Sequence, residues 1–259
     1  MTGFFGETAQ RPLIAAHRGY KAKYPENTML AYREALALGV DMIELDLRLS
    51  RDGQLVMIHD AALDRTTDGH GPVEQCTLEE LRRFDAGRGE RIPIFEEFLD
   101  WVHATGLFLN VEIKTKTFET VDKAVALLKR YRMLEPSVIA CFDAGITEYA
   151  NRAHGAKTQG FPRRAMQNFK RNSYGFLYSV GIEMCDLTPA LAEKFNRRGI
   201  QPWCWCPDTP AGIERMLACG ATLCTCNDPV PALEILRGRG VHKSSASCCG
   251  SPPSSGAPV

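Results

Sequence analysis

The sequence predicts an α/β fold, a (β/α)8 barrel of the TIM type with a short insertion after the second strand. Short apolar runs alternate with amphipathic helical patterns about eight times, and polar residues follow several of these runs at their C-terminal ends. The 259 residues also match the roughly 250 residues of a typical barrel. An open doubly wound sheet is the alternative, but the sequence contains no GxGxxG or Walker-type loop to support it.

The expected elements follow from apolar periodicity and from residues that start or stop helices. Asn27 or Thr28 is a suitable N-cap for a helix that Gly39 ends, and Pro189 occupies the first position of a later helix. In chain order we expect strands at 13–16, 42–48, 55–58, 107–114, 138–142, 158–161, 182–187, 201–206 and 222–226. The expected helices are 29–38, 78–84, 95–104, 120–131, 146–154, a broken helix at 162–178, 189–196, 209–218 and 229–237.

Two segments do not fit the regular alternation. Residues 61–91 are rich in polar residues and glycine, and we interpret them as an insertion near the active face of the barrel. Residues 241–259 are rich in Ser, Pro, Gly and Ala, so we expect a disordered tail after a single barrel domain at 1–240.

Composition limits the classes of function. Thirty-one basic and thirty-one acidic residues give zero formal net charge, which argues against a nucleic-acid partner and requires any phosphate recognition to be local. The sequence has no secretory signal pattern and no apolar run of about 18 residues, so we expect no transmembrane segment and a cytoplasmic location. The ten cysteines lie mostly in apolar runs of a long chain, which favours free thiols in a reducing compartment. The sequence predicts no oligomeric state.

Three acidic residues lie where parallel strands end. Glu44 and Asp46 alternate with aliphatic residues on one strand, and Glu112 occupies an equivalent place on a later strand. At a separation of about 5 Å and a dielectric constant near 20, each ionised pair repels by roughly 3 kcal/mol. Such a cluster keeps protons, recruits cations or binds a divalent metal, and carboxylate oxygens suit Mg²⁺ or Ca²⁺. The alternative is a solvated rim of unrelated acids.

Two histidines and two cations accompany these acids. His17 and His59 each follow an apolar run, so both can face the same barrel mouth and serve as general acid and base. A structural role is the alternative for either histidine alone. Arg18 and Lys114 supply hydrogen-bond donors for a phosphate without making the protein basic.

Six ordered motifs resemble the signature of the glycerophosphodiester phosphodiesterase family, a branch of the phospholipase C-like phosphodiesterases. They are His17-Arg18-Gly19, Pro25-Glu26-Asn27-Thr28, Glu44-Leu45-Asp46, His59-Asp60, Leu63-Asp64-Arg65-Thr66-Thr67 and Glu112-Ile113-Lys114. The resemblance spans roughly residues 13 to 237. It implies metal-dependent hydrolysis of a small glycerophosphodiester to sn-glycerol 3-phosphate and an alcohol.

The resemblance also assigns roles to residues. It implies that Mg²⁺ or Ca²⁺ is held by three residues, Glu44, Asp46 and Glu112. By the same resemblance, His17 and His59 form the acid-base pair, and Arg18 and Lys114 face the phosphate. Trp205 packs on the ligand or in the core, and Glu26 and Asn27 organise the first loop. A substrate hydroxyl attacks phosphorus in related phosphodiesterases, and the glycerol 2-hydroxyl is the analogous nucleophile here.

The C-terminal strands depart from the family pattern. The sequence reads Trp205-Cys206-Pro207-Asp208 where Trp-Thr-Val-Asn is usual, and Cys226-Asn227-Asp228-Pro229 where Thr-Asn-Asp-Pro is common. Two Cys-x-Cys pairs, at 204–206 and 224–226, suggest either a soft-metal site or small buried hydrophobic side chains. These changes leave two alternatives for function: a lysophospholipase D-like enzyme with an acyl groove, or a barrel that binds phosphodiesters without turnover.

Overall fold

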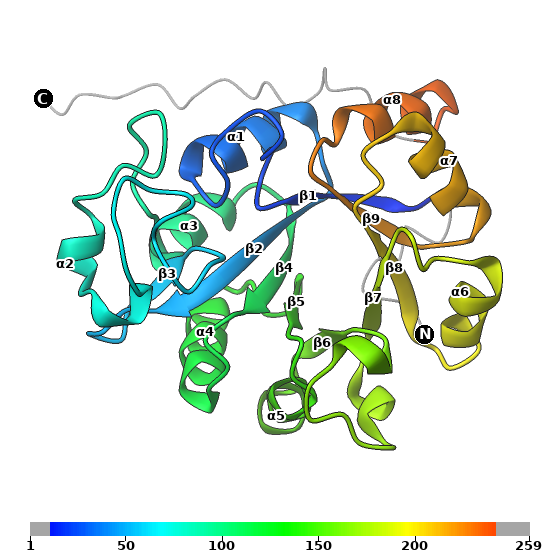
Figure 1. Cartoon of the computed structure of the whole chain (residues 1–259). Coiled ribbons are helices and arrows are strands. Elements are labelled where there is room, and N and C mark those ends of the chain that lie inside the picture. Colours follow the sequence, from blue (N-terminus) through cyan, green and yellow to red (C-terminus); the bar gives the residue numbers. More distant parts are fainter. Residues whose placement is uncertain (1–10, 242–259) are drawn as a thin grey trace, which may run out of the picture.

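The computed structural model describes residues 11–241, and its strands form a closed barrel (Figure 1). The eight parallel strands are β1 (Leu13–His17), β2 (Met42–Leu49), β4 (Phe108–Ile113), β5 (Ser137–Ala140), β6 (Lys157–Gly160), β7 (Ser179–Glu183), β8 (Gln201–Trp205) and β9 (Leu223–Cys226). Strand β1 pairs in parallel with both β2 and β9, and this double pairing closes the sheet. The predicted (β/α)8 barrel is therefore confirmed. The expected tail at 241–259 lies, apart from its first residue, outside the described residues.

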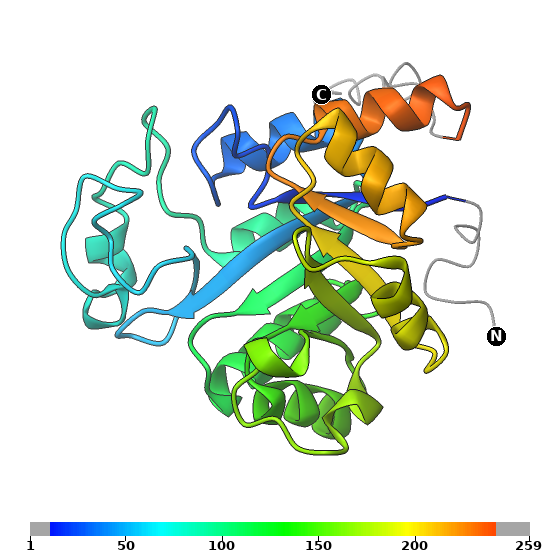
Figure 2. The same cartoon turned by 45° about the vertical axis from the view of Figure 1, so that its right-hand side comes forward.

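Helices surround the strands on the outside of the barrel (Figure 2). They are α1 (Met29–Leu38), α2 (Leu78–Leu81), α3 (Phe95–Val102), α4 (Phe118–Arg130), α5 (Ala144–His154), α6 (Pro189–Asn196), α7 (Pro210–Ala218) and α8 (Val230–Gly238). The longest described helix, α4, has 13 residues, and no described helix has the length and apolarity needed to span a membrane.

The ends of α1 and α6 follow from single residues. Thr28 accepts a hydrogen bond from the backbone N–H of Ala31 and so caps α1 at its start. Gly39 ends the helix with φ of 85°, a left-handed conformation that glycine adopts without steric cost. Pro189 begins α6, with Thr188 as the capping residue. The sequence predicted these boundaries correctly.

The interior of the barrel changes from apolar to polar along its axis. At one end Leu13, Ala15, Met42, Val138, Trp203 and Leu223 form a closed apolar cluster. Each parallel strand points alternate residues inward, so residues further along β1, β2 and β4 enter the other half of the barrel. These residues include His17 at the end of β1, Glu44 in register with it on β2, and Glu112 near the end of β4. Apolar side chains therefore close one end of the barrel, and polar side chains line the open end.

The insertion after β2 has a small core of its own. Strand β3 (Leu55–Met57) pairs antiparallel with β2, and a 3₁₀ helix η1 (Val73–Gln75) and α2 follow it. Seven buried residues form the insertion's core: Val56, Ile58, Leu63, Val73, Leu81, Ala86 and Ile92. This packing holds residues 59–67 beside the barrel mouth, as the sequence predicted. The helix expected at 78–84 is shorter, because the helical geometry ends at Leu81.

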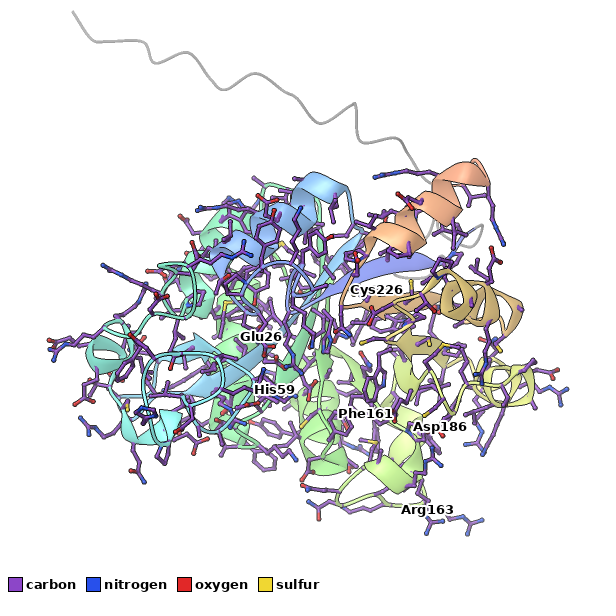
Figure 3. The ribbon with its side chains drawn as sticks, turned by 45° about the horizontal axis from the view of Figure 1, so that its top comes forward. Glu26, His59, Phe161, Arg163, Asp186 and Cys226 are labelled. Atoms are coloured by element: carbon purple, nitrogen blue, oxygen red, sulfur yellow. The ribbon has the colours of Figure 1, made fainter. Side chains whose placement is uncertain are left out.

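The predicted broken helix at 162–178 is wrong. The segment contains only two 3₁₀ helices, η2 (Arg163–Ala165) and η3 (Ser173–Phe176). Gln167 donates its backbone N–H to Phe142 O and accepts from Ala144 N, so tertiary contacts replace helical hydrogen bonds. Asn168 adopts φ of 52°, which also interrupts a right-handed helix. The basic residue Arg163 of this segment lies at the outer edge of the molecule, remote from the mouth (Figure 3).

Candidate active site

A cavity of about 140 Å³ opens at the C-terminal mouth of the barrel. It is lined by His17, Arg18, Glu44, His59, Asn110, Glu112, Lys114, Ala140, Phe142, Gln159, Phe161, Trp205 and Thr225. Every residue that the sequence suggested for metal, acid-base or phosphate contact lines this cavity except Asp46, which is fully buried beside it. The barrel closure brings these residues together from strands that are distant in sequence. Figure 3 shows Glu26 and His59 on one side of the mouth and Phe161 on another.

The three predicted acidic residues form one cluster. Asp46 on β2 is in register with Glu112 on the neighbouring β4, and Glu44 lies two residues earlier on β2. One oxygen of each carboxylate lies within 4.8 Å of an oxygen of the other two. Glu44 and Asp46 are 4% and 0% exposed, so water screens their mutual repulsion little. The arrangement is a buried, convergent set of oxygen ligands.

The three carboxyl groups of the cluster differ in how readily they lose their protons. Burial raises the pKa of Glu44 well above its ordinary value, and the charges of Asp46 and Glu112 add to that rise. Burial likewise raises the pKa of Glu112. Burial acts in the same direction on Asp46, but Lys114 and Arg18 outweigh it and hold the pKa of Asp46 at about 2. Without a metal, Asp46 is therefore the charged member and Glu44 retains its proton most strongly.

The cluster fits a hard divalent cation. Asp46 Oδ1 is buried and accepts no hydrogen bond from the described residues, with only the Lys114 ammonium 3.3 Å away. A buried carboxylate oxygen without a hydrogen bond is costly unless a cation satisfies it. Three carboxylates supply oxygen ligands only, which suits Mg²⁺ or Ca²⁺ better than Zn²⁺.

His17 is the last residue of β1, and its two ring nitrogens face different surroundings. Nδ1 lies 2.7 Å from Asn227 Oδ1, whereas Nε2 lies 3.8 Å from Glu44 Oε2 on the side of the acidic cluster. Burial lowers the pKa of His17 to about 3, and the positive charges of Arg18 and Lys21 contribute to the same direction. His17 is therefore neutral at pH 7 and has one unprotonated nitrogen available.

His59 follows β3 and belongs to the insertion. Its Nδ1 lies 2.5 Å from Asp60 Oδ1, and the guanidinium of Arg65 donates to the other oxygen of Asp60 at 2.6 Å. Burial lowers the pKa of His59, and the negative charges of Asp46 and Asp60 oppose that shift. The carboxylate on Nδ1 accepts a hydrogen bond from the Nδ1 proton and favours the imidazolium form, and only that form carries a transferable proton on Nε2.

Two predicted phosphate-binding cations pair with the acidic residues. Arg18 Nε lies 3.1 Å from Asp46 Oδ2, and its Nη1 donates to Glu26 Oε1 at 2.8 Å. Lys114 Nζ lies 2.6 Å from Glu112 Oε1 and 3.3 Å from Asp46 Oδ1. Both cations reach the cavity, so an anionic ligand there meets positive charge beside the acidic cluster.

Glu26 and Asn27 organise the loop after β1. Glu26 accepts hydrogen bonds from Arg18 and from both terminal nitrogens of Arg65, so it joins this loop to the insertion. Asn27 donates Nδ2 to Asp46 Oδ2 at 2.8 Å and accepts from the Tyr32 hydroxyl with Oδ1. The loop therefore orients side chains of the acidic cluster.

Aromatic side chains form the apolar wall of the cavity. The rings of Phe142 and Phe161 stack with centroids 3.5 Å apart and planes 9° from parallel. Trp205 also lines the cavity, and its Nε1 is buried without a hydrogen-bond partner among the described residues. The sequence identified Trp205 but not the two phenylalanines, which follow β5 and β6, two strands without a recognised motif.

Sequence reasoning assigned no role to several polar residues of the site. Asn227 contacts His17, and Asp208 holds Asn227 in place through its side-chain and backbone N–H groups. Asn110 donates to Gln159 at 2.6 Å beneath the cavity. Asn227 and Asp208 stand in the C-terminal motifs noted above, but only the closed barrel brings them to β1.

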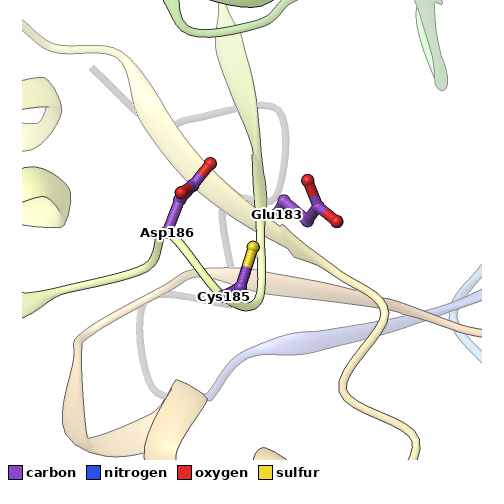
Figure 4. Close-up of side chains that lie close together, drawn as sticks. All are labelled: Glu183, Cys185 and Asp186. Carbon is purple, nitrogen blue, oxygen red and sulfur yellow. The ribbon is translucent and has the colours of Figure 1, made fainter.

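The cysteine-rich strands contain no soft-metal cluster within residues 11–241. Cys204, Cys224 and Cys226 are fully buried with free thiols, as expected of small hydrophobic side chains. A second set of close ligand atoms lies at the end of β7 and in the loop that follows, and comprises Glu183, Cys185 and Asp186 (Figure 4). Its members are largely exposed, and Asp186 already pairs with Arg164. The acidic cluster on β2 and β4 is the only such set that lies inside the described barrel.

Comparison with known proteins identifies the family of this chain. The model of the glycerophosphoryl diester phosphodiesterase family matches residues 17–230. A glycerophosphodiester phosphodiesterase of Caldanaerobacter subterraneus is 30% identical over 254 residues, which cover 88% of this chain and 98% of that protein.

Two solved structures share the fold. A glycerophosphodiester phosphodiesterase from Agrobacterium tumefaciens has a TM-score of 0.75 at 23% identity and covers 86% of this chain and 99% of its own. A phosphodiesterase from Oleispira antarctica, solved with sn-glycerol 3-phosphate as product, has a TM-score of 0.79 at 22% identity and covers 88% and 97%. The match of the family model across most of the chain confirms the resemblance noted in the sequence. The chain belongs to the glycerophosphoryl diester phosphodiesterase family of hydrolases.

Proposed function

We propose that this enzyme hydrolyses small glycerophosphodiesters to sn-glycerol 3-phosphate and an alcohol, with a divalent metal and two histidines. One observation carries the proposal: two histidines, two cations and an acidic cluster converge on a single cavity at the C-terminal barrel mouth. The product bound to the Oleispira antarctica phosphodiesterase, a barrel of the same fold, supports the choice of substrate.

Glu44, Asp46 and Glu112 would hold Mg²⁺ or Ca²⁺. When bound, the metal supplies Lewis acidity, which stabilises negative charge near phosphorus and lowers the pKa of an adjacent hydroxyl. Arg18 and Lys114 bind the phosphodiester oxygens from the same cavity. The three aromatic residues of the wall pack against the carbon atoms of the substrate.

The surroundings of the two histidines support a different role for each. His17 is neutral, with Nδ1 occupied by Asn227, so its Nε2 accepts the proton of the glycerol 2-hydroxyl. The 2-oxygen forms a bond to phosphorus while the bond to the leaving alcohol breaks. His59 acts in its imidazolium form, which Asp60 stabilises, and donates its Nε2 proton to that alcohol oxygen. In the second step, water gives a proton to His59 and its oxygen forms a bond to phosphorus. The bond between phosphorus and the 2-oxygen breaks, and His17 returns its proton to the 2-oxygen.

The size of the cavity favours a small substrate. A volume of about 140 Å³ is well below the roughly 300–1,000 Å³ of pockets that enclose drug-sized ligands. A glycerophosphate group fits this volume, whereas an acyl chain requires additional apolar surface. We therefore favour glycerophosphodiesters over lysophospholipids.

Release of the head-group alcohol by purified enzyme tests the proposal. The small diesters would also give sn-glycerol 3-phosphate, whereas a lysolipid would give lysophosphatidic acid. The substrates are glycerophosphocholine, glycerophosphoethanolamine, glycerophosphoglycerol and a lysolipid, each with Mg²⁺, Ca²⁺ or EDTA. We expect metal-dependent release from the three small diesters and little from the lysolipid. Glu112→Gln should lose at least about 10²-fold in kcat, while Glu183→Gln outside the cavity serves as the matched control. Full activity after metal removal, or binding without release under every metal, would contradict the proposal.

A further inference from the structure

A chain of hydrogen bonds links the loop after β8 to His17 on β1. Asp208 Oδ2 accepts from Asn227 Nδ2 at 2.6 Å, and Asn227 Oδ1 lies 2.7 Å from His17 Nδ1. Asp208 follows Trp205 at the end of β8, Asn227 follows β9, and β9 pairs with β1. Three successive barrel strands thus meet at the back of one imidazole ring.

The carboxylate of Asp208 is fixed by backbone donors. Its Oδ1 accepts the backbone N–H of Asn227 at 2.7 Å and that of Asp228 at 3.1 Å. A backbone N–H can only donate, so the atom at the position of Oδ1 must be an acceptor. This requirement also holds when another side chain replaces Asp208. An ionised carboxylate is also an acceptor at its second oxygen. Oδ2 can therefore only accept, so it pairs with the NH₂ group of the Asn227 amide and not with its oxygen.

The orientation of the Asn227 amide follows from this pairing. With Nδ2 turned toward Asp208, Oδ1 is turned toward His17 and can only accept. His17 Nδ1 must then carry the proton, and in the neutral ring Nε2 carries the lone pair. Nε2 is the nitrogen on the side of Glu44 and the cavity.

The second neighbour of His17 Nδ1, the thiol of Cys206, does not determine which ring nitrogen carries the proton. Cys206 Sγ lies 3.4 Å from His17 Nδ1, and burial raises the pKa of the thiol to about 12. A neutral thiol is a weak donor and a weak acceptor, so it tolerates either tautomer. The polarity of the contact comes from Asn227.

We propose that Asp208 is a positioning residue that sets the tautomer of His17 through the amide of Asn227. It acts without touching the substrate, by keeping the unprotonated Nε2 of His17 directed at the reacting hydroxyl. This inference rests on the role of His17 as general base in the proposed function.

Asp208→Asn is a sharp test because it preserves the shape and reverses one hydrogen bond. The two backbone donors keep the carbonyl oxygen of the new amide at the position of Oδ1, so its NH₂ group replaces Oδ2. This NH₂ group opposes the NH₂ group of Asn227, and the Asn227 amide rotates to remove the conflict. Its NH₂ group then faces His17 Nδ1, which must accept, and the proton moves to Nε2. His17 can no longer take a proton from the substrate.

The double variant Asp208→Asn with Asn227→Asp restores the original polarity. The amide at 208 donates to the carboxylate at 227, and that carboxylate again accepts from His17 Nδ1. A residue that only supports the loop predicts no such rescue. Asp186→Asn is the matched control, because Asp186 is a partly exposed acid in the loop after the neighbouring strand β7 and pairs with Arg164.

Nitrogen-15 NMR of labelled histidines reads the tautomer directly at pH 7, with and without Mg²⁺, and His17→Gln identifies the signals. We expect Nδ1–H in the wild type and double variant, and Nε2–H in Asp208→Asn. We also expect kcat of Asp208→Asn to fall by about 10²-fold with KM nearly unchanged, and the double variant to recover to within about 10-fold of wild type.

An Nε2–H tautomer in the wild type overturns the proposal even if a variant fails to fold. An unchanged tautomer in Asp208→Asn overturns it as well. A tautomer change with unaltered kcat supports the positioning and instead refutes the assignment of His17 as the base. Glycerol 3-phosphate release by the wild type is a separate measurement, so failure of the overall function is recognised independently.

Discussion

The side-chain amide of Asn27 donates a hydrogen bond from Nδ2 to Oδ2 of Asp46 at 2.8 Å, and both residues are buried. The two residues are 19 positions apart, on the first loop and the second strand. Asn27 adopts φ of 56°, a left-handed conformation that asparagine tolerates better than most residues. The loop backbone thus aims an amide at a carboxylate of the proposed metal site.

Asn27→Gly tests this orientation. Glycine accepts the left-handed backbone but removes the amide, which leaves Asp46 Oδ2 and the buried Tyr32 hydroxyl without that partner. We expect a loss of about 1–3 kcal/mol in the free energy of unfolding and about 10- to 100-fold weaker metal binding. Urea denaturation and Mg²⁺ titration measure the two effects. Asn168→Gly removes an asparagine with φ of 52° outside the site and should leave metal affinity unchanged.

Metal binding should release protons. In the metal-free protein, burial and two neighbouring carboxylates raise the pKa of Glu44 well above its ordinary value. A metal ligand must be deprotonated, so Mg²⁺ or Ca²⁺ displaces a proton from the cluster and affinity rises with pH. Calorimetric titration in buffers of different ionisation enthalpy measures the number released. A binding enthalpy that is the same in every buffer would show that the cluster is fully ionised beforehand.

Glu26 should make stability depend on pH in acid. Burial opposes ionisation, but hydrogen bonds from Arg65 and the charge of Arg18 lower its pKa from 4.5 to about 2. Below about pH 4.5 the unfolded chain binds a proton that the folded chain does not, so stability decreases as pH falls toward 2. With Arg65 half exposed, the contribution is on the order of 2 kcal/mol.

Urea unfolding of the wild type and Glu26→Gln between pH 6 and pH 2 measures this contribution. The stability difference between the two proteins should be largest above pH 5 and should shrink toward zero near pH 2. Glu79→Gln removes an exposed carboxylate that pairs with Arg83 and should give a small difference at every pH. A Glu26→Gln difference that does not change with pH would refute the ion-pair explanation.

The leaving group distinguishes the roles of the two histidines. If His59 protonates the departing alcohol, His59→Gln should lose about 10²- to 10⁴-fold in kcat with glycerophosphocholine. The loss should be much smaller with a p-nitrophenyl ester of glycerol phosphate, because p-nitrophenolate departs without a proton. His17→Gln should lose similar factors with both substrates. The opposite pattern would exchange the assigned roles.

Local sequence patterns were sufficient to locate the barrel and much of its site. Alternation along β2 put Glu44 and Asp46 on one face, and the position of His17 at the end of an apolar run put it at a strand terminus. Parallel strands align their C-terminal ends, so residues at those ends converge without further information. The segment 162–178 shows the limit of this reasoning. Its pattern predicted a helix, but the backbone of Gln167 instead forms hydrogen bonds with Phe142 and Ala144, which follow β5.

The sequence by itself determined the fold class and the residue types of the acidic and histidine motifs, because strand periodicity and capping act over a few residues. Only the tertiary structure decided which partners those residues meet. Closure of β9 onto β1 places Asn227 at 2.7 Å from His17 across 210 positions, and the loop after β8 adds Asp208. Such contacts depend on barrel closure and strand register, and no local pattern encodes them. The protonated nitrogen of His17 is therefore a property of the closed barrel.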